Sequence, residues 1–191
     1  MRDQGTYGYH CTKRFFVSPE SKEMYGAWPW GASALNWNII RYSSVLLWKA
    51  EALIELGTDL EQARQLINKI RSRAANKEYW VRDFKDNKKY AANYVIGLYP
   101  AAGWTQDYAR KALRFETRLE TAMEGERFFD LVRWGIAAET MNAYFAHERA
   151  TRVYYVNSKF IAGRDEYFPI SNTQYNLSNG AYTQNPGYGS F

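Results

Sequence analysis

The stretch Asn38–Gly57, NIIRYSSVLLWKAEALIELG, decides the predicted fold. Its apolar residues recur three and four positions apart, which is the spacing of one face of an α-helix. It ends at a glycine, a residue that often terminates helices because it adopts left-handed backbone angles without steric cost. The pattern predicts an amphipathic helix whose apolar face comprises Ile39, Tyr42, Val45, Leu46, Ala50, Leu53 and Ile54.

A second helix is expected after a very short connection. Thr58 or Asp59 can cap LEQARQLINKIRSRAA, since either side chain can accept a hydrogen bond from a backbone N–H of the first helical turn. So short a link makes the two helices antiparallel neighbours. Residues 38–75 therefore predict a tetratricopeptide-like helical hairpin, whose second helix presents the apolar residues Leu60, Ala63, Leu66, Ile67 and Ile70.

The remaining segments differ in composition. Residues 1–37 are rich in glycine, proline, serine and aromatic residues without a sustained period, and are predicted to form an aromatic loop region. Residues 76–105 form a long irregular loop, a type of connection that is often functional. Helical spacing returns over 106–150, with a break at Gly125. Residues 151–191 combine partial alternation with many turn-forming residues and predict a strand and loop tail.

Composition and motifs exclude several classes of function. The 25 Lys and Arg residues exceed the 20 Asp and Glu residues only mildly, and they are scattered among acids, so no nucleic-acid partner is expected. The single cysteine, Cys11, and the two histidines, His10 and His147, do not have the spacing of metal ligands, so no metal site is expected. The chain also lacks a phosphate-binding loop, and no cofactor is expected.

Charged residues are concentrated in ETAMEGERFFDLVRWG, Glu120–Gly135. Glycosidases place two carboxyl groups about 5–10 Å apart across a cleft, usually from separate elements. A row of acids on one helix, interspersed with arginines three or four residues away, instead favours ion pairs that join helices. We predict a structural network in which at least two members are paired and partly buried, formed by Glu120, Glu124, Arg127, Asp130 and Arg133.

The aromatic residues, 17% of the chain, suggest a binding function. A flat ring can cover the apolar C–H face of a sugar while amide, carboxylate or guanidinium groups bond its hydroxyls. Exposed rings can equally anchor a protein partner. Trp48 and Trp134 are predicted to be core residues. The candidate carbohydrate contacts are Tyr25, Trp28 and Trp30 in the first loop region, and Trp80 and Trp104 in the long loop, where Asp83, Asp86, Asn87 and Asn93 supply polar groups.

Three separated segments, in order, resemble the C-terminal portion of the SusD/RagB family. They are IIRYSSVLLWKAEALIELG with ARQLINKIRSRA, then FETRLETAMEGERFFDLVRWG, and finally YFPISNTQYNLSNGAYTQNPGY. The resemblance extends from about Gly8 to Tyr188. It implies a mostly α fold of tetratricopeptide-like helical hairpins, with long irregular loops and a strand and loop C-terminal tail.

Members of this family are surface glycan-binding lipoproteins of Bacteroidota. The resemblance implies non-catalytic binding of an oligosaccharide or polysaccharide at the outer membrane, in partnership with a SusC-like TonB-dependent transporter of a polysaccharide-utilisation system. A lipid anchor is then expected upstream of this sequence. Two alternatives remain: a helical-repeat module that docks on the transporter without touching sugar, and a carbohydrate-active enzyme.

Overall fold

The computed structural model describes residues 39–190 of the chain. They belong to two compact units, residues 1–123 and 124–191, which are described separately. Over residues 39–190 the regular structure is helical, and the ladder pairing is limited to an isolated antiparallel bridge between Arg82 and Tyr90. The expected mostly α fold class is therefore confirmed.

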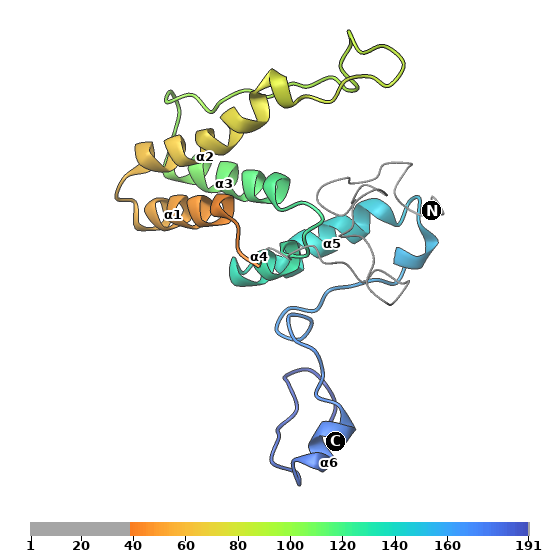
Figure 1. The fold of residues 1–191 in the computed structure, drawn as a ribbon. Helices are drawn as coiled ribbons and strands as arrows, with labels where there is room; N and C mark the ends of the chain where they lie inside the picture. Colours follow the sequence, from red (N-terminus) through yellow and green to blue (C-terminus); the bar gives the residue numbers. More distant parts are fainter. Residues whose placement is uncertain (1–38, 191) are drawn as a thin grey trace, which may run out of the picture. The chain divides into compact units, whose positions relative to one another are not determined.

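The described part of the first unit is built around three α-helices: α1 (Tyr42–Leu56), α2 (Leu60–Ala75) and α3 (Gln106–Glu120) (Figure 1). Gly57 ends α1 with a φ of 64°, in the left-handed region, as its position in the sequence predicts. The Asp59 side chain accepts a hydrogen bond of 2.8 Å from the Gln62 N–H and so caps α2. Together α1 and α2 form the predicted helical hairpin.

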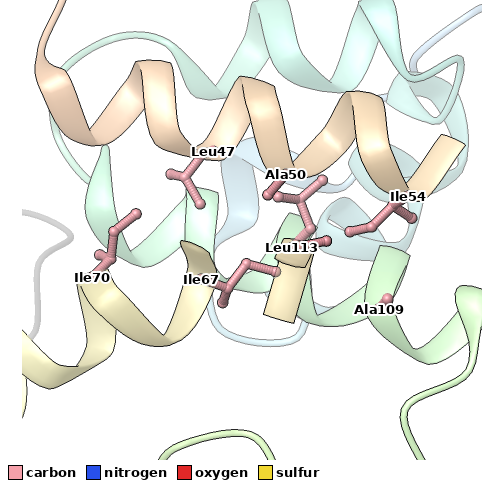
Figure 2. Close-up of a cluster of buried hydrophobic side chains, with 8 residues drawn as sticks. Leu47, Ala50, Ile54, Ile67, Ile70, Ala109 and Leu113 are labelled. Atoms are coloured by element: carbon pink, nitrogen blue, oxygen red, sulfur yellow. The ribbon is translucent and has the colours of Figure 1, made fainter. Parts of the chain in front are cut away.

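The hydrophobic core of this unit is built from all three helices (Figure 2). Ala50 and Ala63 are fully buried, and so is Ala109 on α3. Small side chains at these contact positions allow the helix backbones to approach closely. Larger aliphatic side chains fill the space between them: Leu47 and Ile54 from α1, Ile67 and Ile70 from α2, and Leu113 from α3.

The buried face of α1 differs from the predicted one. Ile39, Tyr42 and Val45 are 82%, 67% and 44% exposed, whereas Ser43 and Ser44 are buried beside Leu47. A prediction based on hydrophobicity assigns small polar residues such as serine to the surface. It therefore places the buried face of the helix on the side of the larger apolar residues. The predicted core position of Trp48 is wrong for the same reason, since this residue is 45% exposed.

Two buried glutamates connect α3 to the other helices. Glu116 is paired with Arg71 of α2 at 2.7 Å, yet its pKa is raised, and burial is the largest cause of this shift. Glu120 accepts hydrogen bonds of 2.6 Å from both Arg41 and Arg73. Burial is the largest single influence on its pKa, but the hydrogen bonds from Arg73, Arg41 and Ser43 together lower that pKa.

The second unit contains the short helix α4 (Arg127–Arg133) and the longer helix α5 (Ala137–Glu148). Helical spacing suggests one continuous helix here, but Gly135 has a φ of 68° and separates the two. The core of this unit comprises Leu131, Ala137 and Phe160, with Phe128, Val132, Ile136, Ala138, Met141 and Phe145 packed around them.

The C-terminal tail contains two short helical elements. The 3₁₀ turn η3 (Val153–Tyr155) lies where partial alternation suggests a strand, and helix α6 (Asn172–Leu177) lies in the part rich in turn-forming residues. The Gln184 side chain bonds both backbone groups of Ile170, at 2.8 and 2.9 Å. A Cβ atom at Gly187 would lie 2.8 Å from Arg164. Gln184 and Gly187 belong to TQNPGY, one of the motifs that carry the family resemblance. The motif therefore helps to hold the tail in its conformation.

Candidate functional site

Residues 77–94, which we call the aromatic hairpin, form the first half of the long loop after α2. The hairpin begins with a 3₁₀ turn, η2 (Lys77–Tyr79), and closes through hydrogen bonds from the Ala91 N–H to the Val81 carbonyl and from the Asp83 N–H to the Lys89 carbonyl. Figure 1 shows this loop beyond the C-terminal end of α2, away from α1 and α3. It is thus a small ordered hairpin that extends from the three-helix core.

Acidic side chains shape the turn of the hairpin. One carboxylate oxygen of Asp83 accepts hydrogen bonds from the backbone N–H groups of Lys85 and Asp86, at 2.7 and 3.2 Å. Asp86 in turn accepts the N–H of Lys88 at 3.1 Å and pairs with the Lys89 ammonium at 3.2 Å. Local bonds of this kind favour turns over regular structure.

Three aromatic rings pack together within the hairpin. The rings of Trp80 and Tyr94 are stacked, with centroids 4.8 Å apart, and Tyr90 meets both edge-on at 5.0 and 6.1 Å. The Trp80 indole N–H donates to the Ala74 carbonyl at 2.9 Å, and the Tyr94 hydroxyl accepts the Val81 N–H at 3.2 Å. These contacts give the hairpin a miniature core and hold the rings in fixed orientations.

The outer surface of the hairpin combines apolar and polar groups. The three clustered rings are half-buried, whereas Tyr79 is 73% exposed and Phe84, in the turn, is fully exposed. Asn87 and Asn93 are exposed as well. The Arg82 guanidinium lies 4.3 Å above the centre of the Tyr90 ring. The hairpin therefore offers aromatic faces for stacking together with exposed amide and guanidinium donors.

The chain returns from the hairpin along α2, where polar side chains hold it. Asn68, which is buried, donates to the Tyr99 carbonyl at 2.9 Å and accepts the Tyr99 N–H at 2.8 Å. Arg64 donates to the same carbonyl at 2.8 Å, and Arg71 donates to the Gly97 carbonyl. Because positions 64, 68 and 71 lie on one face of α2, that face fixes the base of the hairpin.

Trp104, the other tryptophan proposed for this loop, lies apart from the ring cluster of the hairpin. It packs against the core of the three helices, and its indole N–H donates to the Leu60 carbonyl at 2.8 Å. Its ring contacts Tyr99 and Tyr108, each with centroids 5.6 Å away. The geometry of Trp104 thus favours packing, and sugar contact by this residue stays a prediction.

The residues of the predicted charged network fall in both units. Glu120, in the first unit, pairs with Arg41 and Arg73 as described. In the second unit Asp130 is buried and pairs with Arg133 at 3.0 Å. The guanidinium of Arg127 lies 5.8 Å from the centre of the Trp134 ring. Glu124 also belongs to the second unit.

A second group of rings, in the second unit, was not identified from the sequence. Tyr155 is stacked with Phe145 at 5.4 Å and lies 4.5 Å from the ring of Tyr154, which is 63% exposed. A hydrogen bond with Tyr155, together with burial, raises the pKa of Tyr144 to about 12. The signal in the sequence was the run VYY, but its partial alternation suggested a strand.

Tyr25, Trp28 and Trp30, the other predicted sugar contacts, lie outside the described residues. Between residues 39 and 190 no group of three or more His, Cys, Asp or Glu side chains is arranged to hold a metal ion. None of the helices in that part of the chain has the length and apolar character of a membrane span.

Comparisons with known proteins agree with this architecture. The model of the SusD family matches residues 2–188. SusD-like protein P2 of Formosa agariphila is 25% identical over 156 residues, which are 82% of this chain and 26% of that protein. The crystal structure of a SusD homolog from Bacteroides thetaiotaomicron superposes with a TM-score of 0.59 and 28% identity, covering 83% of this chain and 28% of the other.

The chain spans about a quarter of the length of these two relatives. The match to the family model covers nearly all of its sequence, including the helical hairpin and the C-terminal TQNPGY motif. The chain therefore belongs to the SusD family.

Proposed function

We propose that this chain is part of a non-catalytic glycan-binding protein of the cell surface and that the aromatic hairpin contacts the glycan. In this proposal the protein is held at the outer membrane by a lipid anchor and delivers oligosaccharide to a SusC-like TonB-dependent transporter. Membership of the SusD family supports this role. Within the described residues, the observation that carries the proposal is the ring cluster of Trp80, Tyr90 and Tyr94 beside exposed polar groups.

Each part of the hairpin has a role in the proposed binding. Phe84 and Tyr79 supply exposed ring faces for the C–H surface of a sugar. Asn87 and Asn93 supply amide donors and acceptors for its hydroxyls. Trp80 helps to hold the Tyr90 and Tyr94 rings in place, because its ring packs against both and its indole N–H is bonded to the Ala74 carbonyl. A rigid surface of this kind loses little conformational entropy when it binds.

Further contacts are proposed outside the hairpin. Tyr25, Trp28 and Trp30 remain predicted sugar contacts, because tryptophans on either side of a proline in MYGAWPWG present rings in different directions. A catalytic role is not proposed for the glutamates of α3. Both Glu116 and Glu120 are buried and paired with arginines, which suits a structural role better than acid and base catalysis across a cleft.

Affinity electrophoresis of the 191-residue chain in gels containing a panel of neutral and acidic polysaccharides tests the proposal. We expect retardation by at least one polysaccharide and a clear loss of retardation for Phe84→Ala. This side chain is fully exposed, so its truncation leaves the folded core unchanged. The same electrophoresis applied to Trp28→Ala tests the proposed contacts in the first loop region.

Leu56→Ala is the matched control, since Leu56 is also a strongly exposed apolar residue but lies at the end of α1. It is expected to keep the mobility shift of the unaltered chain. If no polysaccharide retards the chain, glycan binding by this chain is refuted. If Phe84→Ala and Leu56→Ala behave alike in the presence of a bound glycan, the hairpin is not the contact surface.

One observation favours the alternative of a protein-docking module. Helix α1 exposes a row of apolar side chains at helical spacing, namely Tyr42, Val45, Trp48 and Leu56. Rows of this kind pack against other helices in tetratricopeptide-like arrays. Pull-down of a SusC-like transporter by the chain, lost on Trp48→Ala and unaffected by added glycan, would support docking through α1.

A further inference from the structure

We infer that the aromatic hairpin selects negatively charged glycans, those that carry carboxylate or sulfate groups. The inference rests on the proposed glycan binding and adds a ligand class to it. It follows from the excess of basic over acidic residues in the hairpin, from the hydrogen bonds that Asp83 and Asp86 make within the turn, and from the position of Arg82 over the Tyr90 ring.

The hairpin carries more basic than acidic residues. Its eighteen positions contain five basic residues and three acidic ones. The basic residues are Lys77, Arg82, Lys85, Lys88 and Lys89, and the acidic ones are Glu78, Asp83 and Asp86. All five basic side chains are exposed. Since the hairpin extends from the helical core, this excess of positive charge is presented where a large polymer can reach it.

The two aspartates of the turn bond mainly to backbone N–H groups, and Asp86 also forms an ion pair with Lys89. Asp83 uses its carboxylate for the backbone N–H groups of Lys85 and Asp86. Asp86 accepts the Lys88 N–H and pairs with the ammonium of Lys89. Lys85 and Lys88 therefore take part in the turn through their backbones, while their ammonium groups extend from an exposed loop. A carboxylate or sulfate on a ligand would provide such groups with a charge-assisted partner.

Arg82 is the residue proposed to bind the anionic group of the glycan. Its guanidinium lies 4.3 Å above the Tyr90 ring, and this contact favours one orientation of the side chain before a ligand binds. The planar guanidinium can donate two parallel hydrogen bonds to a carboxylate or a sulfate, which lysine cannot do. Because Tyr90 also contacts Trp80 and Tyr94, the arginine lies at the ring cluster of the hairpin, in the same loop as the exposed rings proposed to stack on sugar.

Isothermal titration with pairs of polymers that share a backbone tests the inference. The carboxylate pair is polygalacturonate and its methyl-esterified form, and the sulfate pair is dextran sulfate and dextran. Polyglutamate serves as a polyanion without sugar rings. We expect at least one charged polymer to bind about tenfold more tightly than its uncharged counterpart, with the preference shrinking as NaCl is raised. The pair that shows the preference identifies the anionic group.

Two triple variants separate local from overall charge. In the hairpin variant, Arg82, Lys85 and Lys88 are each changed to Gln. In the control, three exposed lysines elsewhere, Lys49, Lys111 and Lys159, are changed to Gln. Both reduce the formal net charge by three. We expect the hairpin variant to lose about tenfold in affinity for the charged polymer and the control to lose less than about twofold.

The single change Arg82→Lys keeps the charge but removes the planar donor pair. We expect it to weaken binding of the charged polymer by about threefold. Equal affinity for charged and uncharged polymers, equal losses in the two triple variants, or equally tight binding of polyglutamate would each overturn the inference. Equal affinity within the pairs leaves the proposed glycan binding intact, whereas absence of binding to every polysaccharide refutes both.

Discussion

Arg41 and Glu120, 79 positions apart in the sequence, form an ion pair of 2.6 Å that joins the start of α1 to the end of α3. The same arginine also donates to the backbone carbonyl of Glu120 at 2.8 Å. Arg73 of α2 binds the other carboxylate oxygen, so a single residue of α3 connects all three helices. Within residues 39–190, Glu116, one helical turn earlier, has an ion pair with Arg71 alone. This difference in partners has measurable consequences.

Glu120→Gln is expected to destabilise the chain at pH 7 by about 2 kcal/mol, because it removes charge-assisted hydrogen bonds from a partly buried site. The pKa of Glu120 is lowered in the folded state, so its contribution is present above its unfolded value of 4.5 and is lost as pH falls through the folded value. Urea unfolding of the variant and the unaltered chain at pH 7 and pH 3 should show a smaller cost of the substitution in acid. A cost independent of pH would contradict this account.

Glu116→Gln is expected to behave oppositely. Burial raises the pKa of Glu116, so the stabilising contribution of its protonated form is complete below 4.5 and is lost as pH rises through the folded value. The amide cannot ionise, so at pH 7 the variant should be as stable as the unaltered chain or more stable. Urea unfolding of Glu116→Gln and of the unaltered chain at pH 7 and pH 3 measures this difference in stability. A large loss of stability at pH 7 would show that the Arg71 pair outweighs the cost of burial.

Leu113→Ala is expected to lower the free energy of unfolding by about 3 kcal/mol, because Leu113 is 1% exposed and contacts the core formed by all three helices. Leu119→Ala on the same helix is the control, since Leu119 is 50% exposed. Its cost should stay below about 0.5 kcal/mol. Denaturant titrations of the two variants would refute the packing described for α3 if their costs were similar.

Asn68→Ala is expected to loosen the base of the aromatic hairpin. The change leaves the Tyr99 N–H without its side-chain acceptor, at a cost of about 1–3 kcal/mol, while Arg64 still bonds the Tyr99 carbonyl. Hydrogen exchange followed by mass spectrometry should show faster exchange over residues 94–99. Asn87→Ala changes an exposed residue of the hairpin and should leave the exchange rates of residues 94–99 unchanged. Unaltered protection at Tyr99 in Asn68→Ala would contradict the proposed anchoring.

Gly187→Ala is expected to disrupt the packing of the C-terminal tail. Gly187 has a φ of 80°, and a Cβ atom there would lie 2.8 Å from the Cβ and Cγ atoms of Arg164. Left-handed strain and this overlap together should cost about 2 kcal/mol. Gly189→Ala is the matched control, because its Cβ would meet no atom within 4 Å. Limited proteolysis of the tail should be accelerated only in Gly187→Ala, and equal rates would refute this role for the motif.

Some of the architecture was predictable because it depends on local chemistry. Helix ends at Gly57 and Asp59 follow from backbone freedom and from side-chain capping within one turn. The helical hairpin follows from the short link between them, and the family resemblance from ordered motifs that the family model matches. The break between α4 and α5 at Gly135 was not predicted, because helical spacing of the apolar residues continues across it.

The sequence alone determined that α1 and α2 form a helical hairpin, that α1 ends at Gly57 and α2 begins after Asp59, and to which family the chain belongs, since these depend on residues close together in the chain. Only the tertiary structure decided that Ser43 and Leu47 face the core while Val45 and Trp48 do not. It also decided that Trp80 joins a ring cluster while Trp104 packs against the helices. The physical reason is that packing depends on partners distant in sequence, and no local pattern specifies which side chains of an aromatic loop will meet.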